Sequence, residues 1–192
     1  MPRRKTGPNY LTPGLDVRYT MAMLFFLKHG YERFGETYNL TVDLTGQTFE
    51  TERAEAALAG RGVTIRRARP DDQVALTALL EIHWPAWKAE VDKSLLPDPP
   101  SLHLAFYDDQ VIGFSAYDTN NLNSGWFGPM GTDPDYRSLG IGEVLLKRCL
   151  GDQKDQGHRS AIIPWVGPIS FYAHHAGATI DRVFYRYEKH VG

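Results

Sequence analysis

Two glycines open a helical pattern in the sequence Arg137-Ser138-Leu139-Gly140-Ile141-Gly142. Apolar residues recur at Ile141, Val144, Leu145 and Cys149, a spacing that places them on one helix face. Before this sequence the chain reads as a strand that ends near Thr132 and then turns. A helix N-terminus has unpaired N–H groups and a positive dipole end, and glycine lets an anion approach the backbone closely. Residues 137–142, here named the cradle, therefore predict a phosphate or pyrophosphate site.

Two common phosphate motifs do not fit the cradle. A P-loop requires Lys-Ser or Lys-Thr after its second glycine, and Glu143 follows Gly142 instead. A dinucleotide-binding fingerprint requires a third glycine three positions after Gly142, where this chain has Leu145. Neither class of nucleotide site is predicted.

The longer segment 132–142 resembles the acyl-CoA loop of the GNAT acetyltransferases. That loop follows the pattern V-x-P-x-[aromatic]-[RQ]-x-x-G-[IL]-[GA], and the chain departs from it only at Thr132, where the family has valine. The resemblance implies acetyl-CoA as cosubstrate, with its pyrophosphate held by the cradle. It also implies that Met130 and Thr132, on the strand before the cradle, offer backbone groups to the pantetheine arm.

The pattern between residues 63 and 117 predicts a strand, a helix and a hairpin. The helix follows Asp71-Asp72, which are suitable capping residues, and its predicted buried face comprises Ala75, Ala78, Leu79 and Ile82. Alternating residues over 102–107 and 111–117 predict two antiparallel strands that turn at Asp108-Asp109.

After the cradle helix, residues 161–166 predict a strand, residues 169–175 a helix and residues 180–188 a last strand. The whole order predicts an α/β fold, with a mixed central sheet and flanking helices. The GNAT fold has the same order, so residues 63–192 are expected to form a GNAT acetyltransferase domain.

Residues 1–43 resemble the C-terminal lobe of a second, incomplete GNAT domain. Residues 25–31 align with 171–178, and a strand rich in tyrosine and β-branched residues follows each copy. The first copy has no cradle, and Phe26 stands where the second copy has the hydroxyl of Tyr172. We expect a structural lobe, joined to the second domain by a linker over 44–62 that contains a short helix.

The helix of this lobe is apolar on two faces. Tyr19, Met23 and Phe26 lie on one face, while Met21 and Phe25 lie on another. Such a helix requires cover on more than one side, and a lobe of this size cannot supply that cover alone. We expect it to pack either on the chain's own domain or across a homodimer.

Acyl transfer to an amine requires a proton acceptor for the amine and benefits from an acid for the departing thiolate. In the GNAT family the acid is commonly a tyrosine in the helix after the fifth strand, so the resemblance makes Tyr172 the candidate acid. Glu81, at the end of the first helix of the domain, is the candidate base. His83 and Asp118 are alternatives for that role.

One position departs from the family pattern. Members often have an asparagine about seven residues before the acid, where it contacts the pantetheine arm, and this chain has Trp165. The predicted function is transfer of an acetyl group to the primary amine of a small molecule or peptide. The alternative is a non-enzymatic acyl-CoA-binding or assembly protein that has kept the fold.

Composition narrows the class of protein. The formal net charge of -2 gives no reason to expect nucleic acid or a membrane surface as a partner. A single cysteine, Cys149, excludes an internal disulfide and is typical of a reducing compartment, so a cytoplasmic location is expected. No metal site is expected, because the adjacent His174 and His175 point in different directions on a helix.

Overall fold

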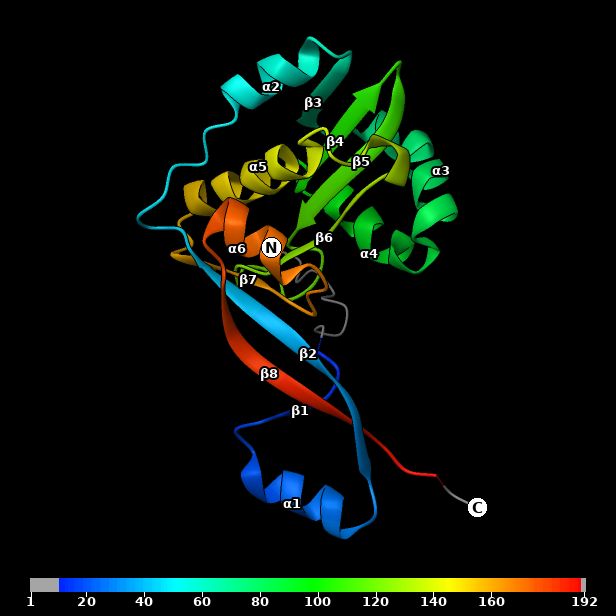
Figure 1. The fold of residues 1–192 in the computed structure, drawn as a ribbon. Coiled ribbons are helices and arrows are strands. Elements are labelled where there is room, and N and C mark those ends of the chain that lie inside the picture. Colours follow the sequence, from blue (N-terminus) through cyan, green and yellow to red (C-terminus); the bar gives the residue numbers. More distant parts are fainter. Residues whose placement is uncertain (1–10, 191–192) are drawn as a thin grey trace, which may run out of the picture. The chain divides into compact units, whose positions relative to one another are not determined.

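The computed structural model describes residues 11–190, which fall into two compact units. Unit 1 is the continuous segment Asp43–Ala161, and unit 2 combines residues 11–42 with residues 162–190. Each unit is a mixture of helices and strands, as Figure 1 shows. The mixed α/β class is therefore confirmed.

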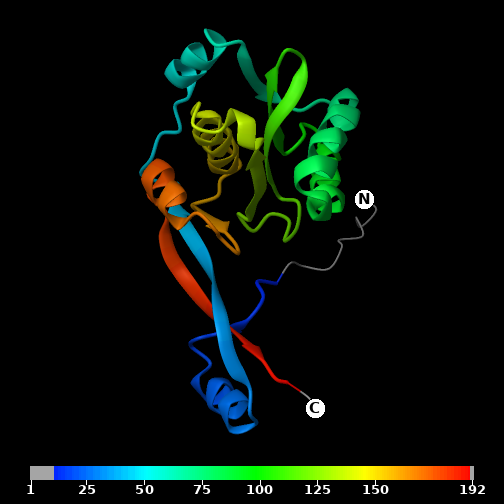
Figure 2. The same cartoon turned by 45° about the vertical axis from the view of Figure 1, so that its right-hand side comes forward.

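Unit 1 contains an antiparallel sheet in the order β3-β4-β5-β6. The predicted hairpin is confirmed, with Ala105 opposite Gly113 and left-handed backbone at Asp108 and Asp109 in the turn. Figures 1 and 2 show α5 on one face of this sheet, with α3 and α4 on the other. The strands and helices of unit 1 are α2 (Glu52–Ala59), β3 (Val63–Arg67), α3 (Gln73–His83), α4 (Lys88–Val91), β4 (Leu102–Tyr107), β5 (Gln110–Tyr117), β6 (Phe127–Thr132) and α5 (Ile141–Asp155).

The two faces of this sheet bury separate hydrophobic clusters. Leu80 of α3 and Val91 of α4 pack with Leu104 and Phe114 on one face. Members of the second cluster come from α2, three strands and α5: Leu58, Val63, Ala105, Ile112, Ile141, Val144 and Leu145. The alternation of side chains along β4 and β5 supplies both clusters from the same strands.

The predicted buried face of α3 is wrong in part. Leu79 is buried with Leu76 and Leu80, but Ala78 is exposed and Ile82 is 72% exposed. The leucines stand at positions i, i+3 and i+4, which form one continuous face. The larger leucine side chains bury more apolar surface than the predicted set. This explains why the helix turns its leucine face, and not the predicted face, towards the sheet.

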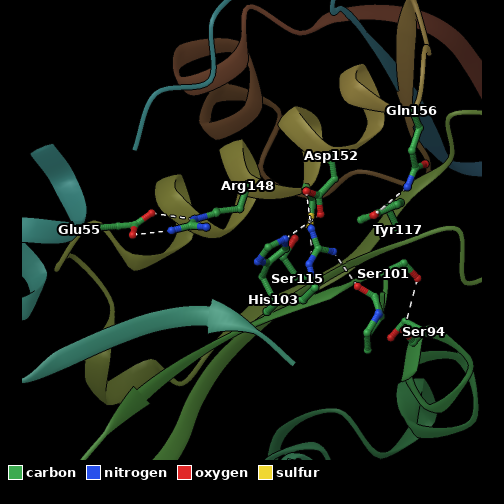
Figure 3. A network of polar contacts seen from close by, with 12 residues as sticks. Glu55, Ser94, Ser101, His103, Ser115, Tyr117, Arg148, Asp152 and Gln156 are labelled. Atoms are coloured by element: carbon green, nitrogen blue, oxygen red, sulfur yellow. Dashed lines mark hydrogen bonds and ion pairs between the residues drawn. The ribbon is translucent and has the colours of Figure 1, made fainter. Parts of the chain in front are cut away.

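A polar network lies between α5 and the sheet (Figure 3). Asp152 accepts a hydrogen bond from Arg67 at 2.6 Å and lies 2.8 Å from Nε2 of the buried His103. Burial raises the pKa of Asp152, but hydrogen bonds from His103 and Arg67 outweigh burial and hold the pKa below its ordinary value of 3.8. One turn earlier, Arg148 pairs with Glu55 at 2.6 Å, which ties α5 to α2.

Unit 2 contains a second sheet in the order β1-β8-β2-β7. Strands β2 and β8 pair antiparallel from Glu32 opposite Glu188 to Thr41 opposite Thr179. Because the two strands run in opposite directions, α1 lies at one end of the pair and α6 at the other (Figure 1). The elements of this sheet and its helices are β1 (Leu15–Asp16), α1 (Thr20–Lys28), β2 (Glu32–Asp43), β7 (Ser160–Ile163), α6 (Ile169–Ala176) and β8 (Thr179–Glu188).

The two predicted helix–strand repeats are both present, as α1–β2 and α6–β8. The predicted linker contains the expected short helix, α2. Instead of one central sheet the strands form two, because β6 ends the first sheet and β7 belongs to the second. Between residues 11 and 190 no helix has both the length and the apolar composition required to cross a membrane.

Candidate functional site

The cradle begins with a tight turn after β6. The side chain of Asp133 accepts a hydrogen bond from the backbone N–H of Asp135 at 3.0 Å, which starts a short 3-10 helix, Pro134–Tyr136. The Asp133 N–H in turn donates to the carbonyl of Ile112 at 2.9 Å. The sheet therefore fixes the position at which the chain leaves β6 and enters the cradle.

Two residues of the cradle have left-handed backbone. Ser138 has φ 68° and Gly140 has φ 90°. A Cβ atom at Gly140 would meet nothing within 4 Å, so glycine is favoured there by its backbone conformation rather than by lack of space. No side chain caps α5 at Gly140, so the backbone N–H groups of Ile141 and Gly142 are available to an anion.

The cradle is anchored on unit 1. Tyr136 and Leu139 pack against the hydrophobic cluster that contains Ile141 and Val144. Arg137 is exposed, and its Nε lies 3.4 Å from the carbonyl oxygen of Thr132. The arrangement thus offers an exposed guanidinium and a helix N-terminus on a packed base, a combination suited to phosphate.

One acidic residue lies in the first turn of α5. Glu143 would oppose a bound anion, but Lys147 pairs with it at 2.6 Å. This pair offsets the charge of Glu143. The positive end of the helix dipole and Arg137 favour an anion, and the exposed carboxylate of Asp135 opposes it.

The end of α3 packs on β6 next to the cradle. A Cβ atom built on Gly131 would lie 2.7 Å from the indole of Trp84, so only glycine fits beneath this ring. His83, an alternative base candidate, has its Nε2 3.5 Å from a carboxylate oxygen of Asp133. The structure therefore brings the end of α3, β6 and the cradle together in unit 1.

The other base candidates lie apart in unit 1. Glu81 is exposed on α3. Asp118, directly after β5, is half-buried, and this burial raises the pKa of its carboxyl group, opposed by the N–H of Asn123. No sequence pattern marks Glu90, whose carboxylate accepts a hydrogen bond from Thr119 near the start of β6. No local motif marks that contact, because the two residues are 29 positions apart.

Tyr172 lies in unit 2, on α6. Its side chain is 8% exposed, and burial raises its pKa to about 12. The ring of Phe171 meets the Tyr172 ring edge-on at 5.1 Å, and Gly177 in left-handed conformation ends the helix. A hydroxyl with this pKa remains protonated at neutral pH, as a proton donor must.

Two aromatic residues of unit 2 also bear on the predicted site. Trp165 is 52% exposed with φ 44°, and its N–H donates to the side-chain oxygen of Asn39 at 3.2 Å. Phe26, the counterpart of Tyr172 in the first repeat, stacks on Tyr187 at 5.2 Å. The cradle and Tyr172 thus belong to different units, each with its own packing.

Comparison with solved structures supports the fold. The chain matches the glucosamine N-acetyltransferase region of a fungal multi-domain β-N-acetylglucosaminidase with a TM-score of 0.76 at 20% identity, covering 94% of this chain and 24% of that one. It matches a related N-acetyltransferase from Sphaerobacter thermophilus with a TM-score of 0.66 at 19% identity, covering 91% of this chain and 57% of that one. The chain therefore spans about a quarter of the first relative and little more than half of the second.

A third match, an N-acetyltransferase from Kribbella flavida, has a TM-score of 0.61 at 16% identity and covers 95% of this chain and 69% of that one. No match was found among the curated proteins. The model of the acetyltransferase (GNAT) family matches residues 68–176, which is more than half of the chain and includes the whole cradle. The chain belongs to the acetyltransferase (GNAT) family.

Proposed function

We propose that this protein transfers an acetyl group from acetyl-CoA to a primary amine of a small molecule or peptide. The observation that carries the proposal is the cradle, with left-handed backbone at Ser138 and Gly140 before an uncapped helix N-terminus. In this proposal the N–H groups of Ile141 and Gly142 bind the pyrophosphate of CoA, and Arg137 adds positive charge.

The pantetheine arm has a suitable partner in β6. This strand lies at the edge of its sheet, with β5 as its strand neighbour, so its outer edge can pair with an extended ligand. Met130 and Thr132 lie on this strand and supply the proposed backbone contacts. The thioester would then lie along β6, away from the cradle.

Tyr172 is the proposed acid. The amine nitrogen attacks the thioester carbonyl carbon, the C–S bond breaks, and the departing thiolate takes the phenolic proton of Tyr172. The proton that the amine releases passes to the proposed base Glu81, directly or through water. Exchange with solvent restores both side chains, so the products are an N-acetylated amine and free CoA.

A second candidate is a protein that binds acyl-CoA without catalysis. The observation that favours it is Trp165, which stands where the family often has an asparagine that contacts the arm. This candidate keeps the proposed role of the cradle but assigns no turnover to Tyr172 or Glu81.

Calorimetric titration with CoA tests the proposed cofactor site. Gly142→Glu brings a side chain and a negative charge into the cradle, and a loss of about 100-fold in affinity is expected because this carboxylate would repel the pyrophosphate. The exposed Glu50 provides a control, since Glu50→Gln should bind CoA like the parent protein. Unchanged binding in Gly142→Glu would remove the cradle from the proposal.

Release of free CoA from acetyl-CoA, measured across a panel of amines, separates the two candidates. The panel includes glucosamine, the acceptor in the name of the fungal relative. Turnover with any amine supports the transferase. Tight CoA binding without turnover supports the binding protein.

A further inference from the structure

The carboxylate of Glu90 is fixed beside the first half of β6. Its Oε1 accepts hydrogen bonds from Thr119 Oγ1 at 3.1 Å and from Asn120 Nδ2 at 2.6 Å. The Thr119 hydroxyl is also 3.0 Å from the carbonyl oxygen of Gly128, and Thr119 is 2% exposed. A buried hydroxyl therefore holds Glu90 close to the backbone of the strand that we propose as the partner of the acyl-CoA arm.

A neighbouring lysine determines which end of the amide faces Glu90. Lys93 Nζ donates to Asn120 Oδ1 at 3.1 Å, so the Nδ2 group of Asn120 faces the carboxylate. Within residues 11–190 both hydrogen bonds to Glu90 fall on Oε1. A carboxylate accepts about four hydrogen bonds, so Glu90 retains capacity for another donor.

Two indole rings lie beside the same segment of β6, residues 128–131, and this segment with the side chains next to it is here named the strip. Trp87 precedes Glu90 by three residues, and its ring stacks on Trp84 with centroids 5.8 Å apart and an interplanar angle of 10°. Trp84 covers Gly131, while Thr119 links Glu90 to Gly128. Three strand residues span about 10 Å, the length of a small molecule.

The charges around Glu90 leave it suited to a cation. Lys88 is paired with Asp92 at 3.2 Å, and Lys93 donates to the neutral amide of Asn120, so among the described residues neither lysine forms an ion pair with Glu90. Both indoles are only partly buried, and an aromatic face attracts a cation or an apolar skeleton. The strip thus has a negative end, where Glu90 lies near Gly128, and an apolar end, where Trp84 covers Gly131.

We propose that Glu90 selects a cationic amine as acceptor. The ammonium group donates a hydrogen bond to the Glu90 carboxylate, and the carbon skeleton of the acceptor packs on Trp84 and Trp87. This inference rests on the proposed function, because it places the acceptor beside the segment of β6 that would hold the arm. It assigns to Glu90 a binding role that is separate from the acid Tyr172 and the base Glu81.

Equilibrium dialysis with the full-length protein saturated with CoA tests the inference. The probes are 2-phenylethylamine, which is a cation at neutral pH, and 2-phenylethanol, its neutral analogue. A charge-assisted hydrogen bond predicts that the parent binds the amine about tenfold or more tightly than the alcohol. Equal binding of the two probes, or binding of neither, would overturn the inference without any variant.

Glu90→Gln removes the charge but keeps an oxygen that accepts from Thr119 and Asn120, so the fold is retained. Affinity for 2-phenylethylamine should fall about tenfold, from the loss of one charged hydrogen bond. Affinity for CoA and for 2-phenylethanol should not change. Glu50→Gln is the matched control and should bind both probes like the parent.

The outcomes separate this inference from the proposed function. If the parent does not bind CoA, the proposed function fails and the inference fails with it. If CoA binds but Glu90→Gln holds the amine as tightly as the parent does, Glu90 does not select the acceptor and the cradle assignment stands. If Glu90→Gln loses binding of CoA, of the alcohol and of the amine alike, Glu90 is only a structural link between α4 and β6.

Discussion

Units 1 and 2 differ in how their helices are packed. In unit 1, α5 buries seven residues between Ile141 and Gln153, and the sheet beneath it is covered on both faces. In unit 2, α1 is richer in apolar residues, yet none of them is buried, and Met21 and Phe25 are 78% and 58% exposed. Apolar composition alone therefore does not make a core, because each helix requires a surface to pack on.

The strands show the same difference. Strand β5 of unit 1 is buried along seven of its eight residues, whereas no residue of β8 in unit 2 is buried. A two-stranded antiparallel pair is only marginally stable on its own. The stability of unit 2 therefore depends on the pairing of all its strands into one sheet. The stability of unit 1 depends on its hydrophobic clusters and its charged network.

Deletion of residues 1–43 is expected to have the largest effect. It removes β2, which lies between β8 and β7, so the sheet of unit 2 loses its central connection. We expect a large loss of soluble protein and of the cooperative thermal transition, while every cradle residue remains in the chain. A truncated protein that is soluble, monomeric and as heat-resistant as the parent would show that the lobe is dispensable.

Asp152→Ala should break the charged network of unit 1. It leaves His103 and Arg67 without their carboxylate, and removal of one partner from a buried pair costs about 3–5 kcal/mol. Urea unfolding measures this loss. Asp155→Ala, an exposed position on the same helix, is the control, and its free energy of unfolding should change by no more than about 0.5 kcal/mol.

The same carboxylate predicts a dependence on pH. Because the pKa of Asp152 is lowered from 3.8 on folding, its stabilisation is present above that value and is lost as the pH falls through the lower folded pKa. The difference in stability between the parent and Asp152→Ala should therefore shrink below pH 3.8. A difference that stays constant to lower pH would contradict this assignment.

Tyr172→Phe tests the chemistry that we assign to unit 2. Loss of a general acid lowers turnover by about 10²-fold or more, while CoA affinity should stay the same. Since its pKa is about 12, Tyr172 should not itself cause a loss of activity between pH 7 and about pH 10. Phe26→Tyr, the reciprocal change in the first repeat, should leave turnover unchanged.

Met21→Ser should have the smallest effect on stability. The side chain is 78% exposed, so the free energy of unfolding should change by no more than about 0.5 kcal/mol. If α1 forms the homodimer contact that we propose as one arrangement of the lobe, sedimentation should show a shift towards monomer. An unchanged sedimentation profile together with a dimeric parent would place the dimer contact elsewhere.

The sequence predicted most of unit 1 because its signals are local. The turn at Asp108-Asp109 and the first glycine of the cradle suit left-handed backbone, and the structure has left-handed residues at Asp108, Asp109 and Gly140. The buried face of α3 was less predictable. Several overlapping apolar faces existed on that helix, and the sheet selected the one with three leucines.

Long-range contacts could not be predicted from the sequence. The partners Glu90 and Thr119 are 29 positions apart, and Arg67 and Asp152 are 85 positions apart, with no motif that joins them. The division of the strands into two sheets also escaped prediction. Periodicity identifies a strand, but it does not say which edge the strand joins.

The pairing of β2 with β8 imposes an order on synthesis. A ribosome releases Glu32 of β2 before the helices and strands of unit 1, yet its partner, Glu188, emerges after all of them. Domains generally fold as they emerge, so unit 1 has all of its strands while β2 still waits for its neighbour. During that interval β2 presents an unpaired edge that other chains can join. Chaperone demand during translation should therefore fall on β2 rather than on the cradle.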